Sequence, residues 1–465
     1  MIRCTKHTML ILCSVILLLN PLPAQESHIQ PYDSNPYYWQ YNGEPVMLLG
    51  GSKDDNLFQI PNLEAHLDLM QSVGANYIRN TMSSRDEGNV QPFQQLEDRM
   101  YDLDQWNAEY WQRFENMLEW TSERDIIVQI EVWAFHDFYG EWEEFLPWNP
   151  RYNVNYTAQS TQLDTGSYGS YWETRHDFFY TVPALHNDTE VLRYQQAFVD
   201  KILSYSLEYG HVLYCMTNEI FTQYSPEWGW YWAEYIENRA LEAGVVVQVA
   251  EMYQNHDLTH EQHRATLDHP EIYDFIDISQ NSRQLDDRHW ERLQWVREYI
   301  ADQPRPINHN KTYGGDEVAW TDGDEHGIER FWRNIIGGTA SVRFHRPPSG
   351  IGLNERAQAQ IQSARMLLES INIYDCQPDE EHTLLSERDE DEAYLTYMPG
   401  KEYALYFPEG GSIQLDLTDA NGQFTIQWLH IEKSEWTVSK TIHAGEIVRL
   451  DIPEQGKNWA AVIKK

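Results

Sequence analysis

The sequence predicts an α/β fold, a (β/α)8 TIM barrel followed by a small antiparallel β-sandwich. Apolar runs typical of buried parallel strands alternate with helical periodicity eight times over most of the chain. Near residue 378 the pattern changes to short alternating strands separated by turn pairs. At 465 residues the chain exceeds one ordinary domain. We therefore expect a barrel over residues 25–377 and a β-sandwich over residues 378–465.

The start of the chain, residues 1–24, has the features of a signal peptide. Arg3 and Lys6 supply a positive n-region. Residues 9–19 are apolar and residues 21–24 suit cleavage. The apolar run is about half of the roughly 20 residues that a membrane span needs. We expect a secreted or periplasmic bacterial protein, and no membrane as a partner.

Charge and cysteine content exclude several classes of function. The formal net charge is −39, and loss of Arg3 and Lys6 with the signal peptide lowers it to −41. Such a surface repels nucleic acid and anionic membranes, so neither is expected as a partner. Cys215 and Cys376 remain in the mature chain, and Cys215 lies inside a predicted strand, which disfavours a disulfide. No zinc-type spacing is present, and no metal or cofactor is expected.

The predicted elements follow one another in a regular order. The barrel strands are apolar runs with polar tips at residues 46–50, 76–80, 126–133, 212–220, 245–250, 272–280, 307–311 and 339–345. Between them, apolar residues at helical spacing predict helices at residues 63–73, 106–124, 191–209, 230–243, 293–301, 328–336 and 358–369. Six short alternating strands follow, at residues 393–398, 403–407, 413–417, 423–430, 446–451 and 459–463.

One long insertion interrupts the barrel at about residues 134–188. It is rich in aromatic residues, among them Trp142, Trp148, Tyr168 and Trp172. Long loops without periodicity are usually functional or disordered. We expect a lid that lines the substrate site; the alternative is a structural cover over the barrel rim.

The strongest functional signal is the strand VLYCMTNEI at residues 212–220. Its tip, Asn218-Glu219, holds a carboxyl group at the mouth of the barrel, where catalytic residues of such barrels lie. The asparagine can hydrogen-bond a sugar hydroxyl, and Trp228 and nearby aromatic residues can stack on a sugar ring. The strand therefore predicts a carbohydrate site, with Glu219 as general acid if burial raises its pKa.

Two segments resemble a known family. Residues 107–128 (NAEYWQRFENMLEWTSERDIIV), with the Asn-Glu strand, resemble the apiosidase-like TIM-barrel glycoside hydrolases of the retaining clan. The tail, from YALYFPEGGSIQLDL to NWAAVIKK, resembles the collagen-binding-type β-domain that often follows such barrels. The resemblance implies that Glu219 is the acid/base beside Asn218, that Arg79 supports the catalytic carboxylates, and that a carboxylate ends the seventh strand.

The sequence departs from this pattern at the seventh strand. PINHNKTYGG contains no carboxylate, and the next ones are Asp316 and Glu317 in the loop. The alternatives for the second catalytic carboxylate are Asp316, Glu317, Glu251, Glu131 and Asp55. Asp316 ranks first because Gly314-Gly315 can fold it back into the mouth, and Glu251, at the end of a neighbouring strand, ranks second.

A group of basic residues is predicted at adjoining strand ends. By alternation, His309 and Lys311 share one side of the seventh strand, and Arg343 and His345 share one side of the eighth. These residues are expected to bind the carboxylate or sulfate of an acidic sugar; the alternative is a set of structural ion pairs. With Tyr313, they also suit a β-elimination at a uronic acid.

The candidate site therefore comprises catalytic and binding residues at strand ends. The catalytic candidates are Glu219, Asp316 and Glu251. The substrate-binding candidates are Asp54, Asp55, Arg79, Asn80, Trp133, His136, Asn218, Gln280, His309, Lys311, Tyr313, Arg343 and His345. We expect a secreted glycoside hydrolase of plant or algal saccharides, with an acidic sugar in the site. The alternatives are a lyase or dehydratase acting on uronate-containing oligosaccharides, and a carbohydrate-binding pseudoenzyme.

Overall fold

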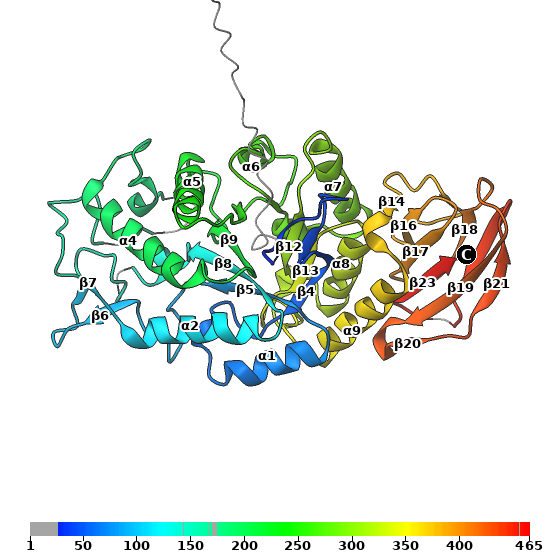
Figure 1. Cartoon of the computed structure of the whole chain (residues 1–465), viewed down its shortest axis with the longest axis horizontal. Helices are drawn as coiled ribbons and strands as arrows, with labels where there is room; N and C mark the ends of the chain where they lie inside the picture. The colour runs from blue at the N-terminus through cyan, green and yellow to red at the C-terminus, as the bar shows by residue number, and fades with distance from the viewer. Residues whose placement is uncertain (1–26, 143, 167, 170–173, 455) are drawn as a thin grey trace, which may run out of the picture.

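The computed structural model describes residues 27–465 except 143, 167, 170–173 and 455. The predicted signal peptide lies outside the described residues. Within them, no helix combines the length and apolarity needed to cross a membrane. Two bodies lie side by side in Figure 1, a strand-and-helix barrel and a group of antiparallel sheets that ends the chain.

Eight parallel strands form the barrel and confirm the predicted fold class (Figure 1). In chain order they are β4 (Leu48–Gly51), β5 (Tyr77–Thr81), β8 (Ile127–Trp133), β9 (Val212–Thr217), β10 (Val249–Ala250), β11 (Ile276–Asp277), β12 (Ile307–Thr312) and β13 (Ser341–Phe344). Each pairs with the next except β10 with β11, which are the two edges of the sheet, and β13 pairs with β4. The edges at β10 and β11 meet through a hydrogen bond from Asp274 N to Val249 O (3.0 Å). Their paired segments are shorter than predicted.

Helices cover the outside of the barrel; the periodicity predicts seven of those named here, but not the two one-turn helices at residues 137–140 and 264–267. They are α1 (Leu63–Ser72), α2 (Ala108–Ser122), α3 (Asp137–Gly140), α4 (Thr189–Ser206), α5 (Glu227–Glu242), α6 (Arg264–Leu267), α7 (Asp286–Tyr299), α8 (Asp324–Ile336) and α9 (Glu355–Ser370). Side chains cap several starts: Asn107 accepts from Glu109 N in α2, and Asn354 accepts from Ala357 N in α9. These caps fix where each helix leaves the loop.

A small sheet closes the bottom of the barrel, opposite the catalytic end. It contains β1 (Gln30–Pro31), β2 (Trp39–Tyr41) and β3 (Glu44–Val46). Trp39 is fully buried against Phe275, and its indole N–H donates to Asn308 Oδ1 (2.9 Å). The sequence does not predict this sheet, because two- and three-residue strands carry no clear period.

Most of the described insertion packs as a structural cover rather than as the expected lid, whereas His136, at its start, lines the cavity described below. Trp148 and Phe178 contact Trp133, and Trp142 packs on His176 with ring centroids 4.3 Å apart. These rings belong to the main hydrophobic core. A hairpin of β6 (Phe93–Gln95) and β7 (Tyr101–Trp106) lies beside them; the sequence analysis does not predict it, and it ends where the predicted helix 106–124 begins. Tyr171 and Trp172 fall outside the described residues.

The C-terminal region contains two antiparallel sheets. The larger contains β14 (Gln377–Pro378), β16 (Tyr394–Met398), β17 (Glu402–Phe407), β19 (Gln423–His430), β20 (Glu435–Trp436), β21 (Lys440–His443) and β23 (Trp459–Lys464). The smaller contains β15 (Leu385–Ser386), β18 (Ser412–Asp416) and β22 (Ile447–Asp451). Leu405 faces the smaller sheet in a shared apolar cluster, as in a β-sandwich.

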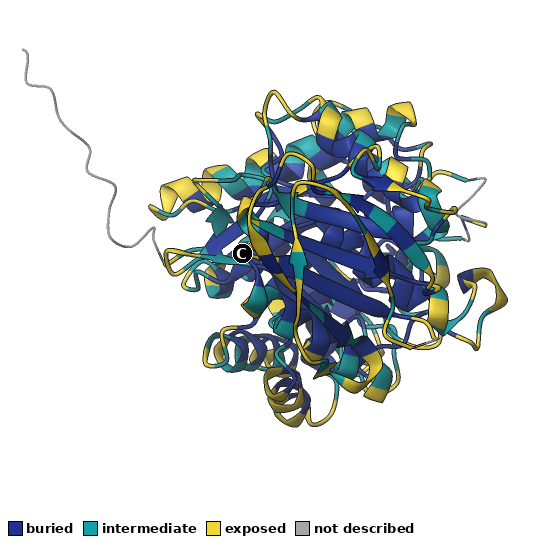
Figure 2. Cartoon of the chain, turned by 90° about the vertical axis from the view of Figure 1, so that its right-hand side faces the viewer, coloured by how far each residue is buried: buried dark blue, intermediate teal, exposed yellow. Residues whose placement is uncertain are grey.

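The other face of the larger sheet packs against the barrel. Ala404 and Tyr406 alternate with Leu405 and belong to the barrel's own core cluster. Tyr406 stacks on Trp332 of α8 with ring centroids 5.7 Å apart. Figure 2 looks onto these sheets and shows buried central strands with exposed residues in the outer strands and loops. The central strands of the larger sheet are therefore buried on both faces, which joins the two bodies through one apolar interface.

Candidate active site

Glu219 follows β9 directly and has a backbone conformation that is rare for a residue with a side chain. Its φ is +61°, in the left-handed region. Hydrogen bonds on both sides fix this turn: Asn218 N donates to Trp133 O (3.1 Å) and Ile220 N donates to Met252 O (3.0 Å). Such conformations persist where the surroundings enforce them, and they cluster at functional sites. Here the turn aims the carboxylate into the mouth of the barrel.

Four side chains bind the Glu219 carboxylate. Oε1 lies 2.6 Å from Gln280 Nε2, 2.7 Å from the Tyr313 hydroxyl and 2.8 Å from Lys311 Nζ. Oε2 lies 2.8 Å from His136 Nε2. Gln280 belongs to the 3-10 turn η4 (Ser279–Arg283), and Tyr313 follows β12. The structure thus brings together five residues that the sequence analysis proposes from four different strand ends.

The pKa of Glu219 does not fit the predicted role of a proton donor. Burial favours a higher pKa, but the charge of Lys311 and the hydrogen bond and charge of His136 outweigh it, and the pKa lies well below its usual range. Glu219 is therefore ionised in the free protein. The expectation of a raised pKa is wrong because the ammonium group of Lys311 lies beside the carboxylate, in an ion pair of the kind given above as the alternative for the basic residues.

Lys311 lies where the family resemblance implies a carboxylate. Its ammonium also donates to Asn218 Oδ1 (2.6 Å), and burial lowers its pKa. The expectation that His309 shares its side is wrong. The register of β12 against β13 shifts between His309 and Thr312, so strict alternation fails there. His309 is buried beside His289 of α7, with ring centroids 5.9 Å apart, while Lys311 faces the cavity.

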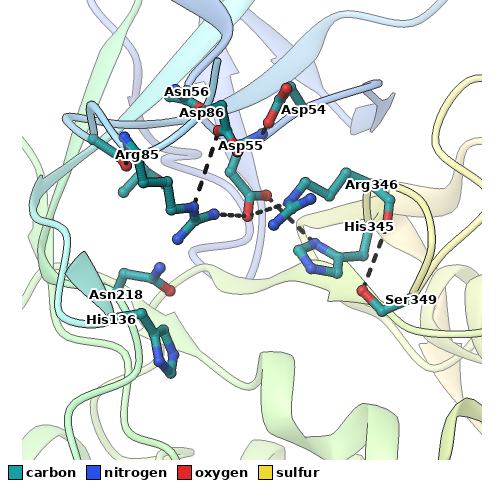
Figure 3. A network of polar contacts seen from close by, with 12 residues as sticks. Asp54, Asp55, Asn56, Arg85, Asp86, His136, Asn218, His345, Arg346 and Ser349 are labelled. Carbon is teal, nitrogen blue, oxygen red and sulfur yellow. Dashed lines mark hydrogen bonds and ion pairs between the residues drawn. The ribbon is translucent and has the colours of Figure 1, made fainter. Parts of the chain in front are cut away.

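Asp55, just beyond β4, is the centre of a second network (Figure 3). Its carboxylate lies 2.5 Å from Arg79, 2.8 Å from Arg346, 3.0 Å from Arg85 and 3.6 Å from His345 Nδ1. Burial opposes ionisation, but these cations hold the pKa of Asp55 well below its usual range. Arg79 also pairs with buried Glu131 at 2.5 Å. Asp55 is therefore a permanently ionised carboxylate near neutral pH.

A cavity of about 550 Å³ joins the two networks. Its lining includes seven predicted site residues: Asp55, His136, Asn218, Glu219, Lys311, Tyr313 and His345. Arg79 and Gln280 contact its carboxylates from behind. A cavity of this size accommodates a small ligand of a few sugar units.

Two predicted catalytic residues lie outside the cavity. Asp316 is exposed, and its carboxylate accepts from Asp324 N (3.1 Å) at the start of α8. The Gly314-Gly315 hinge therefore does not return it to the barrel mouth. Glu251 is buried beside α5, where it accepts from Thr217 N (2.8 Å) and Met252 N (2.9 Å). Burial raises its pKa well above the usual range, which suits a structural carboxyl group.

Four predicted binding residues do not line the cavity and instead support the surrounding structure. Arg343 is fully buried, donates to Asn310 O (3.0 Å) and Ser52 Oγ, and does not reach the cavity. Trp133 belongs to the aromatic core. Asn80 accepts from Phe58 N (3.1 Å), and Asp54 accepts from Asp55 N (2.8 Å). The sequence correctly places each near a strand end but does not show which way its side chain points.

Other cavity residues lie in loops and were not among the predicted site residues. They are Arg85, Phe221, Gln254, His256, Arg283, Trp320, Arg346 and Ser349. Arg346 directly follows His345, a member of the predicted basic group. The others stand several residues beyond strand ends, where neither alternation nor helical spacing applies.

One group outside the cavity has metal-ligand geometry. The donor atoms of Asp286, His326 and Glu329 lie within 4.8 Å of one another. Arg333 lies 3.0 Å from Glu329 and 3.8 Å from Asp286, so a guanidinium already offsets these carboxylates. We therefore assign no metal to this group.

No family model and no curated protein sequence matches the chain. A solved glycoside hydrolase matches its structure with a TM-score of 0.64 and 10% identity, covering 95% of this chain and 97% of its own. A family 5 glycoside hydrolase from Bacteroides vulgatus matches with a TM-score of 0.63 and 11% identity, covering 95% and 94%. An endo-1,4-β-mannanase from Rhizomucor miehei matches with 0.51 and 14%, covering 74% and 100%.

These likenesses establish a shared fold. The first two cover nearly the whole of both chains, so they include the C-terminal sheets as well as the barrel. The chain is thus a TIM-barrel protein with the architecture of solved glycoside hydrolases. Function has to be argued from the site, because one barrel fold supports many chemistries.

Proposed function

We propose that this protein is a glycoside hydrolase that cleaves plant or algal oligosaccharides containing an acidic sugar. The observation that carries the proposal is the pair of carboxylates in one cavity at the carboxyl ends of the barrel strands. Glu219 follows the fourth strand beside Asn218, and Asp55 follows the first. Catalytic groups of TIM barrels occupy this end, and glycosidic cleavage uses two carboxyl groups.

The two carboxylates suit different roles. Three guanidinium groups keep Asp55 ionised, as required of a nucleophile or of a group that stabilises positive charge on the sugar. Glu219 must carry a proton to serve as the acid, and Lys311 opposes this in the free protein. An anionic substrate group that competes for the ammonium raises the pKa of Glu219. The acid is therefore formed when an acidic substrate binds.

A second candidate is β-elimination or dehydration at a uronic acid. The observation that favours it is the ionised state of Glu219, which makes it a proton acceptor, beside Lys311 and the Tyr313 hydroxyl. Such groups can remove a proton next to a carboxylate and neutralise the charge that develops. We rank it second because the similar solved structures with a named activity are described as glycoside hydrolases.

Analysis of reaction products tests the proposal. A panel of neutral, uronate-bearing and sulfated oligosaccharides should include an apiose-bearing one, because the apiosidase-like resemblance is part of the proposal. Hydrolysis gives new reducing ends without unsaturation, whereas elimination gives ultraviolet absorbance. Glu219→Gln should lower the rate at least about 100-fold, the usual minimum for general acid catalysis. The control is Glu119→Gln, at an exposed position on α2. A Glu219→Gln variant with most of its activity would refute the assignment.

Export forms part of the same proposal. It is supported by the basic and apolar pattern of residues 1–24. N-terminal sequencing of the protein from culture medium or periplasm should begin at Gln25. Detection of full-length chain in the cytoplasm alone would refute export without affecting the assignment of the active site.

A further inference from the structure

Arg283 differs from the other cations of the cavity because no carboxylate neutralises it. Lys311 pairs with Glu219, and Arg85 and Arg346 pair with Asp55. Within the part of the chain that the structure describes, Arg283 forms no hydrogen bond or ion pair, and its Nε is buried without a partner. An unpartnered buried donor of this kind is costly unless a ligand supplies the acceptor.

Aromatic rings hold this guanidinium in place. Its central carbon lies 4.0 Å from the ring centroid of Trp320 and 5.5 Å from that of Tyr313. The two rings are themselves in edge contact, with centroids 5.0 Å apart. Stacking of this kind orients arginine without using its N–H donors. Arg283 therefore presents a preorganised donor set to the cavity.

The position of Arg283 connects it to the catalytic carboxylate. It ends η4, the turn that also supplies Gln280 to Glu219. Tyr313, one of its stacking partners, donates to Glu219 Oε1 at 2.7 Å. Trp320 is 44% exposed and offers an apolar face on which a sugar ring can stack. A sugar on Trp320 would thus lie beside both Arg283 and the site of cleavage.

The charge of the cavity agrees with an anionic ligand. Four of its lining residues are permanently cationic, and two are carboxylates, in a chain of net charge −39. The excess of positive charge is local, since charges elsewhere on the surface are screened within about 10 Å at moderate ionic strength. Such a field favours entry of an anionic sugar and disfavours occupation by cations.

We propose that Arg283 binds the carboxylate or sulfate group of the sugar that stacks on Trp320. The inference rests on the proposed function and names the residue that selects acidic substrates. It replaces Arg343, which the sequence analysis proposed for this role and which is buried away from the cavity. A planar guanidinium can form two parallel hydrogen bonds to either anion.

Calorimetric titration of matched ligands tests this assignment. A uronate-bearing oligosaccharide is compared with its carboxyl-reduced form, and a sulfated one with its desulfated form, so the two anions are distinguished. Arg283→Gln should weaken binding of one acidic ligand about 10- to 100-fold, as expected for loss of a charge-assisted hydrogen bond. Binding of the neutral partner should change less than about twofold. Arg283→Lys, which keeps the charge but lacks the fork, should give an intermediate loss.

The matched control is Arg193→Gln, which removes an arginine stacked on Tyr194 at 4.2 Å, outside the cavity lining. It should leave all affinities unchanged. Equal weakening of acidic and neutral ligands by Arg283→Gln would overturn the inference while leaving the proposed function intact. Equal affinities of the wild type for both would overturn the inference and the acidic-sugar part of the proposed function, but not the assignment as a glycoside hydrolase. Absence of any saccharide binding or cleavage would overturn both. If Arg283→Gln fails to fold, the affinities of Arg283→Lys for the acidic and neutral ligands decide between selective and equal weakening.

Discussion

Removal of Lys311 should leave the buried Glu219 carboxylate without its ammonium partner and so lower the stability of the fold. In Lys311→Met, Glu219 Oε1 loses an ammonium at 2.8 Å and Asn218 Oδ1 loses a donor at 2.6 Å. The side chains of Lys311 and Glu219 are only 3% and 8% exposed, so water replaces neither contact. Breaking a buried ion pair on one side costs about 3–5 kcal/mol. Methionine keeps most of the apolar stem, so packing loss adds little.

The effect should depend on pH, because it acts through ionisation of Glu219. In the wild type the pKa of Glu219 is lowered by folding, so its contribution to stability is present above about 4.5 and is lost as pH falls through the folded pKa. Without Lys311, the largest cause that lowers this pKa is gone, and the pKa of Glu219 rises relative to the wild type. The variant therefore gains less stability than the wild type from ionised Glu219 above about pH 4.5. The loss of stability in Lys311→Met relative to the wild type should therefore be largest near neutral pH and smallest in acid.

Thermal unfolding midpoints measured between pH 4 and 8 test this reasoning. The double variant Lys311→Met/Glu219→Gln should recover much of the loss at pH 7, because it removes both charges. A Lys311→Met midpoint equal to that of the wild type at pH 7 would refute the ion pair. A deficit that does not change with pH would show that packing, rather than charge, is responsible.

Two further predictions concern stability. Burial raises the pKa of Asp277 to about 7, above its unfolded value near 3.8, so its contribution is present at low pH and lost as pH rises to 7. Relative to Asp277→Asn, the wild type should lose about 2–3 kcal/mol between pH 5 and 8; a constant difference in denaturant titrations would contradict this. Deletion of residues 378–465 should lower the thermal midpoint more than turnover, because it exposes Trp332 but removes no cavity residue. If a folded truncate loses turnover as strongly as stability, the C-terminal sheets contribute to the active site and this prediction is wrong.

The barrel and its main catalytic candidate could be predicted because both depend on local patterns. Buried parallel strands are nearly continuous apolar runs, and the one ending in Asn218-Glu219 has a polar tip where the fold places its active site. Predicted strand ends also supplied His136, Gln280 and Tyr313, which all contact Glu219. A residue at a strand end is close to the mouth whatever the details of register.

The orientation of individual side chains could not be predicted in the same way. A register shift in β12 separates His309 from Lys311, and no sequence signal marks it. Asp55 and Arg346 are 291 positions apart, so their ion pair depends on closure of the whole barrel. Arg283 and Trp320 belong to loops after different strands and meet only in three dimensions. Ionisation states follow from such distant contacts, which is why the expected pKa of Glu219 had the wrong direction.

The two carboxylate networks explain why substrate selection falls to a third group. Asp55 already satisfies three guanidiniums, and a ligand anion could reach Arg85 or Arg346 only by competing with its carboxylate. Lys311 is paired with Glu219 in the free protein, so an anion can bind Lys311 only when that carboxylate takes up a proton from solvent or is displaced. Arg283 requires no such exchange, and its desolvation is already partly offset by stacking. An acidic group should therefore bind Arg283 first, and its negative charge then acts on the adjacent Glu219–Lys311 pair. In this order, substrate recognition precedes and produces the protonated acid that cleavage requires.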